Sequence, residues 1–61
     1  MGEVADRKLV KNIEKALNLL NEATLFIAWG NAENAYWALR EARDALDEAI
    51  DRLSGMLRRE A

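Results

Sequence analysis

The sequence has no cysteine, no proline and no histidine, and only three of its 61 residues are glycine. Without cysteine the chain can form neither disulfides nor thiolates, and without cysteine and histidine it lacks the usual ligands of structural zinc. Gly2, Gly30 and Gly55 do not cluster, so no phosphate-binding glycine loop or dinucleotide fingerprint is present. These absences exclude the common cofactor and metal motifs.

Carboxylates are the remaining candidates for chemistry, and they are concentrated in the second half of the chain. Asp44, Asp47, Glu48 and Asp51 share their helix surface with arginines and lie outside the apolar rows, so the burial that shifts pKa values is missing. A dinuclear carboxylate site would also need Glu-x-x-His pairs. We therefore expect a non-enzymatic protein with no metal and no cofactor. The expected role of these charges is to pair at i,i+4 on a solvated face, as Arg40–Asp44, Arg43–Asp47 and Glu48–Arg52.

Charge and hydropathy also limit the partners. The net charge is −2 and the first half of the chain is neutral overall, which gives little electrostatic drive toward nucleic acid. The most apolar run, Leu17 to Trp29, is too short to span a bilayer and is interrupted by polar residues. The start, Met1 to Lys8, is polar and lacks the apolar segment of a secretory signal. The expectation is a soluble cytoplasmic protein that does not enter membranes.

Gly30 followed by Asn31 is the strongest turn signal and lies at the midpoint of the chain. Glycine tolerates the left-handed conformation that ends a helix, and asparagine is among the best residues for capping the next one. The pattern predicts one all-α domain over residues 1–61, with a helix at 3–29, a turn at 30–31 and a helix at 32–60. Because the connection is so short, the two helices should form an antiparallel hairpin.

Small and large apolar residues alternate along both predicted helices at spacings of three and four, which is the pattern of a helix seam. The seam residues are Ala16, Leu20, Ala23 and Ile27 in the first helix, and Ala35, Leu39, Ala42, Leu46, Ala49 and Leu53 in the second. Alanine allows close approach of two backbones, so we assign the alanine row to the contact within the chain. The leucines are expected to fill the space beside it. The large residues Val10, Leu17, Ile50 and Leu57 would remain for a second hairpin.

A lone pair of helices buries little apolar surface, because each helix offers a single stripe and leaves the rest to water. A small domain without staples usually gains stability by association. We therefore expect a homodimer in which two hairpins form an antiparallel four-helix bundle.

Aromatic residues gather at the predicted hairpin tip. The group comprises Leu25, Phe26, Trp29, Tyr36 and Trp37. On a helical wheel Leu25, Trp29 and Trp37 lie well away from the seam, and exposed tryptophans near one another are typical of a protein contact surface. A second hairpin could instead cover this tip with its own terminal residues. Both interpretations remain open at the level of sequence.

In its length, central turn and small/large alternation the whole chain resembles the Rop family of plasmid copy-number proteins. That resemblance implies a dimeric hairpin that binds paired RNA loops through a polar, basic face of its first helix. Lys8, Lys11, Asn12, Lys15 and Asn18 could supply such a face. The phenylalanine at the middle of that helix has no counterpart here, since the nearest is Phe26. The favoured function is self-association or protein binding, with an RNA-binding regulator or an engineered hairpin as alternatives.

Overall fold

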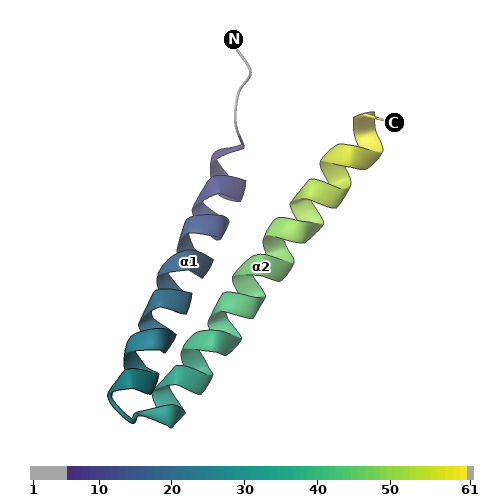
Figure 1. Cartoon of the computed structure of the whole chain (residues 1–61). Helices are drawn as coiled ribbons and strands as arrows, with labels where there is room; N and C mark the ends of the chain where they lie inside the picture. Colours follow the sequence, from purple (N-terminus) through teal and green to yellow (C-terminus); the bar gives the residue numbers. More distant parts are fainter. Residues whose placement is uncertain (1–5, 61) are drawn as a thin grey trace.

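The chain folds into two antiparallel α-helices joined by a tight turn. The computed structural model describes residues 6–60, in which α1 spans Arg7–Ala28 and α2 spans Ala32–Glu60. The helices lie side by side and are closest near the turn (Figure 1). Every described element is helical, so the predicted all-α hairpin is confirmed.

Helix α1 begins at Arg7, later than the predicted start at residue 3, because Asp6 is the capping residue and not part of the first turn. Asp6 has an extended backbone, and its carboxylate accepts hydrogen bonds from the N–H groups of Lys8 and Leu9 at 3.0 and 3.3 Å. Aspartate at this position satisfies two N–H groups that the helix itself cannot. The predicted helical residues 3–5 lie outside the described part of the chain.

The turn has the geometry that glycine permits. Gly30 has a φ of +78°, and the N–H groups of Gly30 and Asn31 donate to the carbonyls of Ile27 and Phe26 at 3.0 and 2.7 Å. These two bonds form a Schellman motif, which ends α1 at Ala28 and leaves Trp29 as its cap. The Asn31 side chain then accepts from the Asn34 N–H at 3.2 Å and caps α2. The predicted roles of Gly30 and Asn31 are confirmed.

Alanine forms the buried core between the helices. The buried residues are Ala16 and Ala23 from α1, and Ala35, Ala38, Ala42, Ala45 and Ala49 from α2. Ala23, Ala35 and Ala38 form one cluster near the turn, against which Phe26 packs. The five alanines of the predicted seam are all among the buried residues, which supports their assignment to the contact within the chain.

The larger seam residues behave differently from the alanines. Leu20, Ile27, Leu39, Leu46 and Leu53 remain 40% to 60% exposed, although we expected the leucines of the seam to fill the space beside the alanines. The reason is geometric, because the close approach of two alanine rows pushes a longer neighbouring side chain out of the contact and onto the flank of the hairpin. Within a single hairpin, therefore, only the alanines of the seam are buried.

Enlarging a core alanine tests this packing. Ala42 is 1% exposed, so Ala42→Leu should force the backbones apart and lower the free energy of unfolding by about 1–3 kcal/mol. Urea unfolding at one fixed protein concentration measures the change. Ala28→Leu, at an exposed alanine, is the control and should have a much smaller effect. A neutral or stabilising Ala42→Leu would contradict the alanine contact.

Substitution of Gly30 tests the turn. A Cβ at Gly30 would meet nothing within 4 Å, so the cost of a side chain comes from the positive φ and not from a clash with neighbours. Gly30→Val should lower the free energy of unfolding by roughly 1 kcal/mol more than Gly30→Asn, since asparagine tolerates this conformation and a β-branched residue does not. Equal losses in thermal or urea unfolding would argue against the left-handed turn.

Candidate interaction surfaces

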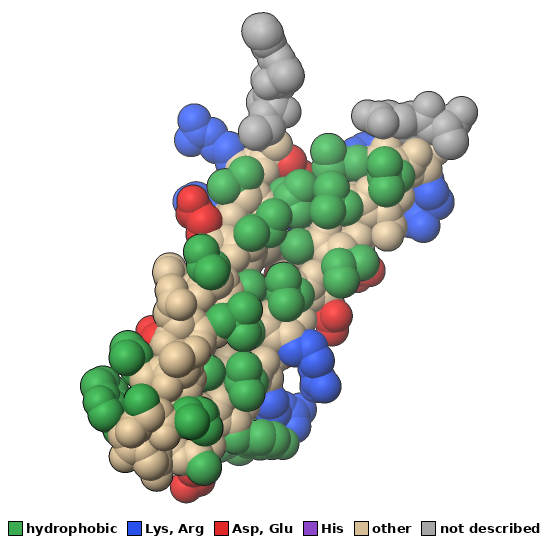
Figure 2. Space-filling model, in the orientation of Figure 1, with side chains coloured by type: hydrophobic (Ala, Val, Ile, Leu, Met, Phe, Trp, Pro, Cys, Tyr) green, Lys and Arg blue, Asp and Glu red, His purple; other side chains and the backbone are tan. Residues whose placement is uncertain are grey.

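One side of the hairpin is covered by hydrophobic side chains from both helices (Figure 2). We call this surface the apolar face and define it by ten residues that are each 40% to 66% exposed. They are Val10, Ile13, Leu17, Leu20 and Ile27 of α1, and Leu39, Leu46, Ile50, Leu53 and Leu57 of α2. At about 100° per residue they fall on the same flank of the alanine contact in both helices. Leu20, Thr24, Ile27 and Leu39 line an open apolar groove between the helices near the turn.

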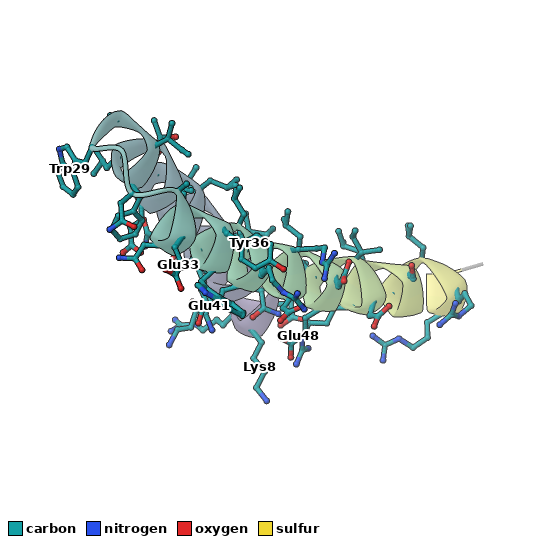
Figure 3. All side chains as sticks on the ribbon, turned by 90° about the horizontal axis from the view of Figure 1, so that it is seen from below. Lys8, Trp29, Glu33, Tyr36, Glu41 and Glu48 are labelled. Atoms are coloured by element: carbon teal, nitrogen blue, oxygen red, sulfur yellow. The ribbon has the colours of Figure 1, made fainter. Side chains whose placement is uncertain are left out.

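The other side of the hairpin is charged. Lys8, Glu41 and Glu48 project from it together (Figure 3). A polar groove runs between the helices on this side, and its lining includes Asn12, Lys15, Glu41, Asp44 and Glu48. Three of these residues are acidic and one is basic. The hairpin therefore has two unlike faces, separated by the alanine contact.

The charges of α2 do not pair along the helix as expected. Within residues 6–59 the structure contains one ion pair, and it joins the two helices: Arg52 Nη1 lies 3.2 Å from Asp6 Oδ2. Arg52 is thus paired with the N-cap of α1 and not with Glu48. Arg40 and Arg43 form no ion pair with Asp44 or Asp47. The i,i+4 prediction was wrong for these residues. Arg52 and Arg40 have other partners, namely Asp6 and the Tyr36 hydroxyl, and nothing in the structure explains why Arg43 does not pair with Asp47.

The aromatic tip divides into two groups. In the first, the rings of Phe26 and Trp29 meet edge to face with centroids 6.3 Å apart. Trp29 is the C-cap residue of α1 and is 71% exposed, whereas Phe26 is half-buried against the alanine cluster. Leu25 is half exposed and lies about 160° around the helix from the buried Ala23, on the outer surface of α1.

The second group includes a residue that sequence analysis missed. Tyr36 and Trp37 meet edge to face at 5.1 Å, and the Arg40 guanidinium lies 5.7 and 5.8 Å from their two ring centroids. Arg40 Nη1 also donates a hydrogen bond of 2.9 Å to the Tyr36 hydroxyl. The i,i+4 and i,i+3 spacings of Arg40 from the two rings were a signal for this contact, but they compete with the equally spaced Asp44.

Phe26 and Trp37 come together in a small depression on the charged side, which we call the aromatic cleft. Its volume is about 210 Å³, and it is lined by Leu19, Glu22, Phe26, Asn34, Trp37, Ala38 and Glu41. It shares Glu41 with the polar groove. The structure therefore joins two residues of the predicted tip with two carboxylates that sequence analysis had not connected to them.

The described residues offer neither a cluster of metal ligands nor a membrane span. Over residues 6–60, no group of three or more His, Cys, Asp or Glu side chains is placed to hold a metal ion. In the same part of the chain neither helix has an apolar stretch long enough to cross a bilayer. The two faces and the aromatic cleft are the surface features of the described residues that bear on function.

Comparison with protein families, with curated proteins and with solved structures finds no match in any of the three. The resemblance to the Rop family therefore rests on architecture alone.

The carboxyl group of Asp6 has a perturbed pKa. The hydrogen bond from the Leu9 N–H is the main cause that holds the pKa of Asp6 below its ordinary value. The Arg52 guanidinium and the Lys8 N–H act in the same direction, and partial desolvation opposes them. A lowered carboxyl pKa means that the folded state favours the charged form, so Asp6 stabilises the fold above the unfolded pKa. That contribution disappears as the pH falls through the folded pKa.

Replacing the carboxylate with an amide tests this linkage. Asn can still cap α1 but cannot ionise, so the wild type should melt at a higher temperature than Asp6→Asn at pH 7. The difference should shrink below about pH 4 and disappear once the pH has fallen through the lowered pKa of Asp6 in the folded state. Circular dichroism melts at matched concentration measure it. A difference that stays constant from pH 7 to pH 2 would show that the charge of Asp6 does not stabilise the hairpin.

Proposed function

We propose that the chain is a self-associating helical hairpin, in which two copies pack apolar face to apolar face and form a four-helix bundle. The observation that supports this most directly is the exposure of the ten large aliphatic side chains while alanines alone are buried among the apolar residues. Soluble monomers rarely leave so large a contiguous apolar surface in contact with water.

The apolar face runs along most of both helices, from Val10 to Ile27 in α1 and from Leu39 to Leu57 in α2. A specific interface of standard size takes about 800 Å² from each partner. Ten large aliphatic side chains that are each 40% to 66% exposed offer a surface suited to such a contact.

The composition of the apolar face suits a second copy of the same chain. In a symmetric dimer the same patch must be complementary to itself, so charge of one sign cannot be concentrated in it. The ten residues of the face are all Val, Ile or Leu, and aliphatic side chains at spacings of three and four can interlock with an identical set. The charged side of each hairpin would remain in water.

The RNA-binding alternative receives less support from the charges. Asn12 and Lys15 lie in the polar groove beside Glu41, Asp44 and Glu48, so the basic residue faces a surplus of carboxylates. Phosphate contacts need unneutralised cations, because counterion release provides most of the affinity for nucleic acid. Self-association therefore accounts for more of the surface than RNA recognition does.

Two leucines of α1 provide a matched test. Leu17 belongs to the apolar face and Leu25 lies on the outer surface, and their side chains are 56% and 50% exposed. Because burial of a leucine contributes about 1.5–3 kcal/mol and the dimer buries two copies, Leu17→Gln should raise the dimer dissociation constant at least tenfold. Leu25→Gln should change it little. Light scattering and sedimentation measure the mass across a range of concentrations.

The wild-type melting temperature should also rise with protein concentration, since folding and association are linked. A monomeric mass at every concentration, with a melt that does not depend on concentration, would contradict the proposal. Equal weakening by Leu17→Gln and Leu25→Gln would show that association uses a surface other than the apolar face.

A further inference from the structure

The aromatic cleft is a second surface that the proposed dimer does not use. It contains Glu41, which projects from the charged side of the hairpin (Figure 3). It is built by α1 and α2 of one chain and stays open whether or not two apolar faces are in contact. Its apolar lining of Leu19, Phe26 and Trp37 is therefore not explained by self-association.

The chemistry of the cleft favours a cation. Phe26 and Trp37 present aromatic rings, whose faces carry partial negative charge and attract ammonium and guanidinium groups. Glu22 and Glu41 add two carboxylates, and neither forms an ion pair within residues 6–59. A cationic group in the cleft would meet the Phe26 ring and the two carboxylates together, while the Trp37 ring already has the Arg40 guanidinium over it.

Trp37 is held in place before any ligand binds. Its indole contacts Tyr36 edge to face, and Arg40 lies over both rings while its guanidinium is hydrogen-bonded to the Tyr36 hydroxyl. Tryptophan, tyrosine and arginine are the residue types most enriched at binding hot spots. Restricting the indole in advance lowers the entropy lost on binding, which is the usual advantage of a pre-organised contact.

The size of the cleft and its continuation identify the kind of ligand. At about 210 Å³ it is smaller than the ~300–1,000 Å³ of sites for drug-sized molecules and suits one side chain. Beyond Glu41 the polar groove adds Asp44 and Glu48, so carboxylates recur along α2 at intervals of three and four residues. A segment lying in this groove would meet an acidic residue at each turn.

We propose that the aromatic cleft binds a lysine or arginine side chain presented by a basic amphipathic helix of a partner protein. The aliphatic stem of that side chain lies along Leu19 and Phe26, and its charged head reaches Glu22 and Glu41. Further basic side chains of the same helix, one turn apart, face Asp44 and Glu48. Nucleic acid does not fit this surface, because the carboxylates repel phosphate.

A synthetic helical peptide with lysines at i, i+4 and i+7 and leucines between them serves as the probe, titrated into the full chain. Its matched control has glutamine in place of each lysine. The indole N–H resonance of Trp37, assigned with Trp37→Phe, should shift and saturate with the lysine peptide and not with the glutamine peptide. Absence of a saturable shift, or the same shift with both peptides, would overturn the proposal.

Variants of the chain locate the site. The double variant Glu22→Gln with Glu41→Gln keeps the shape of the cleft and removes both charges. It should raise the dissociation constant of the lysine peptide about fivefold or more. Glu14→Gln with Glu33→Gln removes the same charge outside the cleft and should have much less effect. Equal weakening by the two double variants would mean non-specific attraction to an acidic protein and would overturn the assignment. The mass of each sample shows separately whether the dimer forms, so failure of this site and failure of self-association are distinguishable.

Discussion

The close contact between two rows of alanine is the constraint on which the rest of the hairpin depends. Because Ala16, Ala23, Ala35, Ala42 and Ala49 have almost no side chain, the backbones of α1 and α2 approach closely and leave no room for leucine between them. The large apolar residues are consequently displaced to one flank, and the charged residues occupy the other. A seam of leucines would have used its apolar residues to hold one hairpin together, and it would have left fewer of them for a partner.

This arrangement separates two tasks in a very small protein. The alanine contact and the Schellman turn define the shape of the hairpin, while in the proposed dimer the apolar face would supply the large burial that a pair of helices cannot provide alone. Trp37 belongs to neither task, whereas Phe26 packs against the alanine cluster and also lines the aromatic cleft. Phe26 and Trp37 lie on the charged side, where they change the character of an otherwise hydrophilic groove. Surfaces on opposite sides of one hairpin can therefore engage different partners without competing.

Much of the fold follows from the sequence, because its strongest signals are local. Gly30 and Asn31 predict the turn, and the recurrence of alanine every seventh residue predicts the contact between helices. The other contacts of the structure were not predicted, because sequence spacing alone does not show which of several possible partners a side chain takes. Asp6 reads as an ordinary first-turn acid until its extended backbone is seen, and Arg40 is as far along the helix from Tyr36 as from Asp44. A helical wheel likewise gives the direction in which Phe26 and Trp37 point from their own helices. It does not show that the packing of the two helices brings these residues into one cleft.

The connection at Gly30 also determines whether the alanine contact forms within one chain or between two chains. It consists of three residues, Trp29 to Asn31, and it reverses the chain through one left-handed glycine with open space around its Cα. If Gly30 and its neighbours in the connection were straightened into helical geometry, α1 and α2 would join into one long helix, and the same alanine rows could pack only against another molecule. Exchange of identical helices between protomers is a low-cost route to oligomers when the hinge is this short. The backbone conformation of this three-residue connection thus separates a folded-back hairpin from an interlocked, domain-swapped assembly of the same sequence.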